Sequence, residues 1–145
     1  MGAGPWLASV AAILAISGPA PAVRPPTSSG PFLPLSDADE TRAQSGCTCT
    51  FLVGSRRRSI DLLQLSGHIL LSRTRAGLNS CPISEAQFQA MAGPSGSAQC
   101  GGRRITISSG PSRQVGDDQA ESAATVTVTR RGRTQVLHGT WACVC

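Results

Sequence analysis

The sequences Cys47-Thr-Cys-Thr-Phe-Leu-Val53 and Trp141-Ala-Cys-Val-Cys145 each combine two cysteines with one large aromatic residue. Side chains of an extended strand alternate between two faces, so each Cys-x-Cys pair shares a face with Phe51 or with Trp141. Cysteines buried beside aromatic rings in an exported domain are typical of disulfides packed in the interior. Both stretches are therefore predicted to be strands whose cysteines face the core.

An even number of cysteines in a small exported chain predicts a complete set of disulfides. Six cysteines allow 15 connectivities, and the sequence does not choose among them. One arrangement lays the first strand antiparallel to the last, so that Cys47 bonds Cys145, Cys49 bonds Cys143 and Cys81 bonds Cys100. Opposite residues of such a ladder have Cα atoms ~4.5 to 5.5 Å apart, which a disulfide tolerates. This pairing would also remove sheet edges, as in a barrel or closed sandwich.

Strand patterns dominate the region between these ends. Apolar or alternating segments predict strands over residues 59–65, 68–72, 103–109 and 123–129, and again from residue 134, with a polar loop over 110–122. A two-residue turn at Arg131-Gly132 sets Val126 opposite Leu137 and directs His138 to the other face. The predicted fold class is mainly β, a small antiparallel barrel or sandwich held by disulfides, with one short α-helix.

The one helix is predicted over residues 85–92. Ser84 is a good N-cap, and Gln87 three residues later completes a capping box. Glu85 suits the helix dipole, and Gly93 provides a stop. Two turns do not persist alone, so we expect the helix to pack through Phe88 and Met91.

The chain is predicted to have three parts. Residues 1–22 resemble a secretory signal peptide, because a short apolar core is followed by the small-residue triplet Ala20-Pro21-Ala22. Residues 23–45, rich in proline and serine, are expected to form a flexible linker. Residues 46–145 hold every cysteine and form the disulfide-rich β domain. We therefore expect a periplasmic or secreted protein without a transmembrane segment after signal cleavage.

The composition narrows the class of protein further. The chain has 145 residues, of which 40% are apolar and 14% charged, which excludes wholesale disorder and a large enzyme. All 13 basic residues are arginine, a bias typical of a GC-rich, bacterial genome. Only 3% of residues are aromatic, so single-stranded nucleic acid, which is usually bound by stacking, is not an expected partner.

Two chemical alternatives have specific residues behind them. The two Cys-x-Cys motifs, with His138 nearby, would suit Zn²⁺ or Cu(I), although zinc ligands are usually two to four residues apart and an oxidising compartment competes for the thiols. A small secreted hydrolase would need His68, Asp61 and a serine brought together, and no Gly-x-Ser-x-Gly elbow supports that grouping. We predict no catalytic residue, metal site or cofactor.

Arginine clusters are the remaining candidate for a binding site. Arg56, Arg57 and Arg58 follow the first strand, and Arg130, Arg131 and Arg133 surround the last turn. If the terminal strands are antiparallel neighbours, these two turns are expected to adjoin and form one basic end. Guanidinium groups bind phosphate and carboxylate well, so the predicted partners are an anionic envelope polymer, a lipid headgroup or an acidic protein. The alternative is that these arginines only keep the surface soluble.

Overall fold

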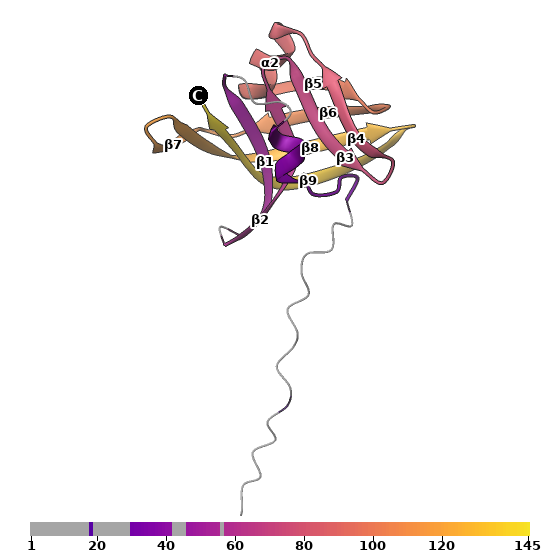
Figure 1. Ribbon diagram of the computed structural model, residues 1–145, viewed down its shortest axis with the longest axis horizontal. Helices are drawn as coiled ribbons and strands as arrows, with labels where there is room; N and C mark the ends of the chain where they lie inside the picture. Colours follow the sequence, from indigo (N-terminus) through magenta and orange to yellow (C-terminus); the bar gives the residue numbers. More distant parts are fainter. Residues whose placement is uncertain (1–17, 19–29, 42–45, 56) are drawn as a thin grey trace, which may run out of the picture.

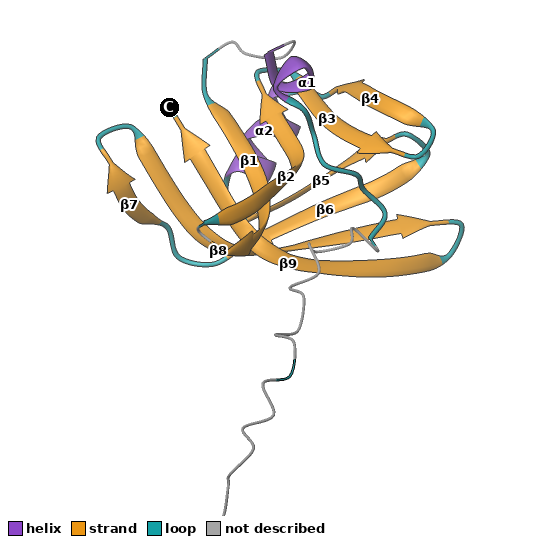
Figure 2. Ribbon diagram, turned by 60° about the horizontal axis from the view of Figure 1, so that its bottom comes forward, coloured by secondary structure: helices purple, strands orange, loops and turns teal. Residues whose placement is uncertain are grey.

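The computed structural model describes residue 18 and residues 30–41, 46–55 and 57–145. In this part of the chain nine strands form one antiparallel sheet in the order β4-β3-β2-β1-β9-β8-β6-β5, with β7 paired to β8. The sheet curls until its two edge strands meet, which gives the nearly closed barrel of Figures 1 and 2. The strands are β1 Thr48–Ser55, β2 Arg58–Ser66, β3 Ile69–Thr74, β4 Gly77–Pro82, β5 Ser95–Cys100, β6 Arg103–Ser109, β7 Arg113–Gly116, β8 Gln119–Arg130 and β9 Arg133–Val144.

The first and last strands are antiparallel neighbours. Cys49 lies opposite Cys143, and Phe51 lies opposite Trp141. Two disulfides, Cys47–Cys145 and Cys49–Cys143, join β1 and its preceding residue to the end of the chain. The predicted mainly β, disulfide-linked fold is therefore confirmed, and the antiparallel arrangement is the one that the structure has.

The third disulfide closes the barrel. Cys81 of β4 bonds Cys100 of β5, and these are the two edge strands of the sheet. Helix α2, Glu85–Ala92, connects them and has the predicted limits. The Ser84 hydroxyl accepts a hydrogen bond from Gln87 N–H, and Gln87 Oε1 accepts one from Ser84 N–H. Its buried side chains, Phe88 and Met91, belong to the same hydrophobic core as Phe51 and Trp141.

The β8–β9 hairpin has the predicted register, with Val126 opposite Leu137. Arg131 and Gly132 form its turn with φ angles of 50° and 75°. Two left-handed residues in succession are what a tight turn between twisted strands requires. His138 is exposed, and its ring lies 3.3 Å from the Thr125 hydroxyl on the outer face.

β1 and β9 diverge after their short ladder. Their pairing ends at Leu52 and Thr140, and β9 continues away from β1 to Arg133. Gly139 lies at the divergence, where a Cβ would collide with the Leu52 carbonyl oxygen and lie 2.9 Å from the Phe51 ring. Only glycine lets the two strands approach so closely before they separate.

Residues 30–41, which we name the strap, differ from the predicted flexible linker. Phe32 is 1% exposed and belongs to the core, and Leu33 forms a β-bridge with Arg73. The strap ends in a helix that the sequence did not predict, α1 Asp37–Thr41, whose Asp39 accepts a 2.9 Å hydrogen bond from Arg73 Nε. The packed unit therefore begins before residue 46. The predicted signal peptide, apart from Gly18, and residues 23–29 and 42–45 lie outside the described residues.

The prediction of a polar loop over residues 110–122 is also wrong. It contains β7 and the first residues of β8, which pair with each other. Every residue of β7 is exposed, so this strand carries no apolar alternation that sequence reasoning could detect. The strands β4 and β5 were missed for a similar reason, because neither has a regular apolar pattern.

Candidate functional site

Three arginines lie side by side where β6, β8 and β9 meet the turns of one end of the barrel. Arg130 is directly opposite Arg133 across the β8–β9 hairpin. Arg104 pairs with Thr129 on the other side of β8, so the next step of the same antiparallel register sets Arg103 beside Arg130. We call Arg103, Arg130 and Arg133 the arginine row. Adjacent strands are ~4.8 Å apart, so three positive side chains start within about 10 Å of one another.

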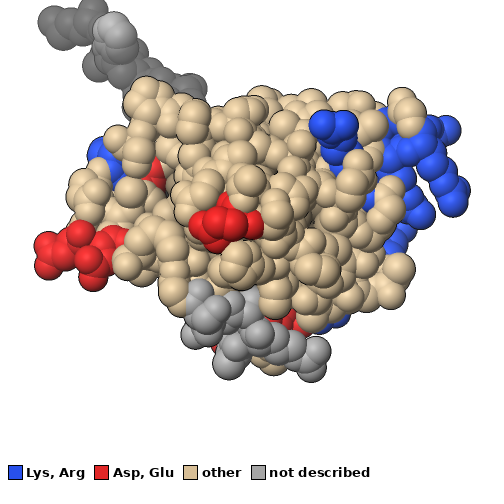
Figure 3. Space-filling model, turned by 90° about the horizontal axis from the view of Figure 1, so that it is seen from above, with Lys and Arg blue, Asp and Glu red and all other residues tan. Residues whose placement is uncertain are grey.

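The electrostatics of the arginine row are unfavourable without an anion. Burial, and then the positive charge of Arg130, lower the pKa of Arg103. Like charges directly opposite each other in a sheet are destabilising. The described residues form the ion pairs His68–Glu85, Arg73–Asp39 and Arg113–Glu121, and none of these includes a residue of the arginine row. Figure 3 shows arginines gathered at this end of the molecule and acidic side chains at the opposite end and in the middle.

The row is well placed to present its guanidinium groups. Arg103 Nη1 donates to the Gly101 carbonyl at 3.0 Å, within the β5–β6 turn, which orients that side chain. Arg130 and Arg133 are exposed, so their forks reach solvent. Because opposite residues of a ladder point to the same face, a single phosphate or carboxylate can contact more than one of them.

The prediction that the two arginine-rich turns adjoin is wrong. Arg57 and Arg58 lie at the β1–β2 turn, and Arg56 is outside the described residues. β1 separates from β9 at Leu52, and both ribbon views place the β1–β2 turn away from the β8–β9 turn (Figures 1 and 2). The arginine that lies beside Arg130 on its other side is Arg103, because β6 and not β1 pairs with β8.

The metal-handling alternative requires thiolates. All six cysteine sulfurs are in disulfide bonds, so neither Cys-x-Cys motif has a free thiolate ligand. No group of His, Cys, Asp and Glu suited to a metal ion is found in the part of the chain that the structure describes.

The hydrolase alternative requires His68 beside Asp61, and the structure separates them. His68 lies in the β2–β3 turn, 3.8 Å from Glu85. Asp61 lies near the other end of β2, where its side chain is hydrogen-bonded to Glu40 of α1. That hydrogen bond, burial and the neighbouring carboxylates raise the pKa of Glu40 to about 7. This carboxyl pair joins the strap to β2 and was missed because Glu40 lies in the predicted linker.

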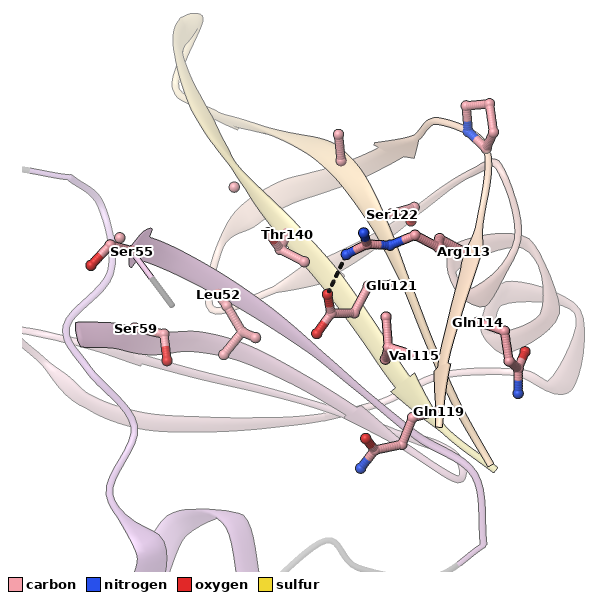
Figure 4. Close-up of a pocket in the computed structure, with 14 residues that line it drawn as sticks. Leu52, Ser55, Ser59, Arg113, Gln114, Val115, Gln119, Glu121, Ser122 and Thr140 are labelled. Carbon is pink, nitrogen blue, oxygen red and sulfur yellow. Dashed lines mark ion pairs between the residues drawn. The ribbon is translucent and has the colours of Figure 1, made fainter. Parts of the chain in front are cut away.

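A broad groove lies on the outer face of the barrel, with a volume of about 990 Å³. The β1–β2 hairpin forms one wall, β7 and β8 form the other, and Gly139 and Thr140 of β9 lie between them. Figure 4 shows the Arg113–Glu121 ion pair, 3.8 Å long, among serine, threonine and glutamine side chains of this groove. Its charges compensate each other, so the groove has no excess charge to select an anion.

No family model, curated protein or solved structure matches this chain. Among the described residues, neither helix has the length and apolar character needed to cross a bilayer. The small, disulfide-rich β domain is compatible with an extracellular, covalently stabilised protein, because such bonds persist in oxidising compartments. The arginine row is the candidate site that the geometry favours.

Proposed function

We propose that this protein is an exported binding domain that holds an anionic polymer of the cell envelope or extracellular space at the arginine row. The observation that carries the proposal is the adjacency, at one end of a covalently closed barrel, of three arginines that form no ion pair with any described residue. Their mutual repulsion is relieved when a phosphate or carboxylate group binds between them, so binding and local stability are coupled.

Repeated anionic groups suit this site better than a single small ion. Exposed arginines interact weakly with one anion in water, whereas several charges on one chain engage the row together. Arg104 and Arg131 lie next to the row in sequence and extend its positive field to the neighbouring surface. We therefore place the contact along the β5–β6 and β8–β9 turns.

The test is affinity for a defined polyanion at several salt concentrations. The full chain is titrated with polyphosphate and with poly-glutamate, and compared with a variant carrying Arg103→Gln, Arg130→Gln and Arg133→Gln. A matched variant, Arg57→Gln, Arg58→Gln and Arg113→Gln, removes the same charge elsewhere. We expect the row variant to bind at least tenfold more weakly, and the matched variant to stay within about threefold of the parent.

Equal weakening in the two variants would show that net charge alone drives association and would refute the proposal. Vesicles of phosphatidylglycerol with phosphatidylcholine, and a folded acidic protein, are measured alongside. Tighter, row-dependent binding to either would replace the polymer with a lipid headgroup or an acidic protein as the partner.

A further inference from the structure

The opposite mouth of the barrel holds a second, chemically different recess. It has a volume of about 340 Å³ and lies between the end of α2, the β6–β7 connection and the last residues of β9. Two cross-strand pairs of β8 and β9 line the recess, namely Ser122 with Trp141 and Ala120 with Cys143. Trp141 and Cys143 are on the core-facing side, because they pair with Phe51 and Cys49. We call this recess the barrel-mouth hollow.

The lining of the hollow has no charged side chain. Alanine, glycine, proline, serine, the indole ring and one disulfide sulfur make up its surface. Serine hydroxyls from the end of β6, the β6–β7 connection and β8 contribute the polar side-chain groups. Such a surface disfavours a charged ligand, which would lose its hydration without gaining an opposite charge.

The walls of the hollow are fixed by backbone and side-chain hydrogen bonds. Ser109 N–H donates to the Pro94 carbonyl at 2.9 Å, and the Ser109 hydroxyl donates to the Gly93 carbonyl at 3.0 Å. Gly110 N–H donates to the Ala123 carbonyl at 2.9 Å. These bonds tie the helix end and the β6–β7 connection to the sheet, so the recess is formed before any ligand arrives. Preformed, mainly apolar recesses in barrel mouths are common ligand sites.

Trp141 provides an independent observation. Its side chain is 2% exposed, and its indole N–H is buried without a hydrogen-bond partner among the described residues. Buried tryptophan N–H groups usually find an acceptor. Trp141 also lines the hollow, so a ligand seated there lies next to the residue that has the unpaired donor, and an acceptor group on the ligand reaches the N–H when the indole shifts towards it.

We propose that the barrel-mouth hollow binds a small, uncharged, mainly apolar molecule with one hydrogen-bond acceptor. A cavity of ~150 Å³ already holds benzene, so this recess has room for a substituted aromatic ring. The site is separate from the arginine row, which lies at the far end of the same β8 and β9 strands. Binding here and polyanion binding there are therefore tested by different ligands and different variants.

The experiment uses acetophenone, an uncharged aromatic ketone, and follows the ¹⁵N-labelled full chain by NMR. Loss of one indole cross-peak in Trp141→Phe assigns the reporter. We expect a saturable shift of that cross-peak and of the Gly110 amide, and at least tenfold weaker binding of benzoate, which has the same ring but carries a charge. A shift that stays linear up to the solubility limit, or benzoate binding as tight as that of acetophenone, would overturn the proposal.

A matched pair of variants locates the site. Ala120→Leu fills the hollow, whereas Ala123→Leu places the same side chain on the opposite face of β8. We expect Ala120→Leu to lower the affinity for acetophenone at least tenfold, and Ala123→Leu to change that affinity less than twofold. If Ala120→Leu loses its dispersed spectrum, Ser112→Phe blocks the hollow from outside the strands. Undiminished binding by every folded blocking variant would place acetophenone elsewhere and refute the assignment.

Discussion

Removing the two terminal disulfides should reveal strong coupling between them. The bonded cysteines are 98 residues apart in Cys47–Cys145 and 94 residues apart in Cys49–Cys143. The Cys49–Cys143 loop lies directly inside the Cys47–Cys145 loop. In the chain-entropy description, either bridge alone restricts the unfolded chain by about 4.7 kcal/mol. Once one is closed, the other closes a ring of only about six residues and adds about 2 kcal/mol. Each bridge is therefore largely redundant while its neighbour remains.

Replacing the outer pair, Cys47 and Cys145, with alanine should cost about 2 kcal/mol in the free energy of unfolding. The inner pair should cost about 3 kcal/mol, since Cys49 is also fully buried in the core and its sulfur contributes packing of about 1 kcal/mol. Removing all four should cost about 8 kcal/mol, which exceeds the sum of the separate losses by about 2 to 3 kcal/mol.

The assay is guanidinium chloride unfolding without reductant, followed by far-ultraviolet circular dichroism and by tryptophan emission. The outer-pair variant is decisive because it keeps the inner bridge and every fully buried core residue, and removes only Cys47, which is half-buried beside the core, and the exposed Cys145. A loss of 4 to 5 kcal/mol from that variant alone would refute the nested-ring reasoning. Strict additivity in a folded four-alanine variant would refute it as well.

Three further substitutions test the strap, the divergence of β1 and β9 at Gly139, and the arginine row. Glu40→Gln keeps a donor for Asp61 at every pH. The pKa of Glu40 is raised to about 7 in the folded parent. Its protonated carboxyl therefore contributes stability that is fully present below pH ~4.5 and is lost as the pH rises through 7. Between pH 5 and pH 8 the free energy of unfolding of the variant should therefore rise by about 1 kcal/mol relative to that of the parent, after discounting for solvent screening. Urea unfolding at both pH values measures this difference, and a difference that does not change with pH would contradict the reasoning. Gly139→Ala should cost about 2 kcal/mol or more by thermal unfolding, whereas Gly110→Ala, whose Cβ has ordinary room, should change little. Arg130→Thr should raise stability by about 0.5 kcal/mol in the absence of polyanion, and a loss would show that the row is not strained by repulsion.

Local patterns were sufficient where covalent or short-range constraints define the structure. The capping box at Ser84 and Gln87 fixed the helix, and the two-residue turn at Arg131 and Gly132 fixed the register of the last hairpin. Cysteine alternation with Phe51 and Trp141 identified the core-facing side of the terminal strands. Each of these features depends on residues close in sequence or on the simple period of a strand.

The strap and the outer strands could not be predicted in this way. Phe32 is buried in a core made by residues distant in the sequence, next to the bridge between Leu33 and Arg73, and no local pattern in a proline-rich segment predicts that packing. β7 is fully exposed, so its strand conformation comes from pairing with β8 and not from an apolar face. Tertiary pairing overrides local propensity at both places.

The arginine row could be predicted only in part from strand register. Arg130 opposite Arg133 follows directly from the turn, so two members of the row were accessible from the sequence. The third required knowing that β6 lies beside β8, whereas sequence reasoning placed the β1–β2 turn there. A ladder predicts neighbours only over the residues that it pairs, and the β1–β9 ladder stops at Thr140, seven residues short of Arg133 at the start of β9. β1 leaves β9 near Gly139, so the β1–β2 turn with Arg57 and Arg58 does not reach the arginine row. β6 pairs with the other edge of β8 and brings Arg103 beside Arg130 independently of β1. The arginine row therefore depends on the β6–β8 and β8–β9 ladders, and not on how far β1 follows β9.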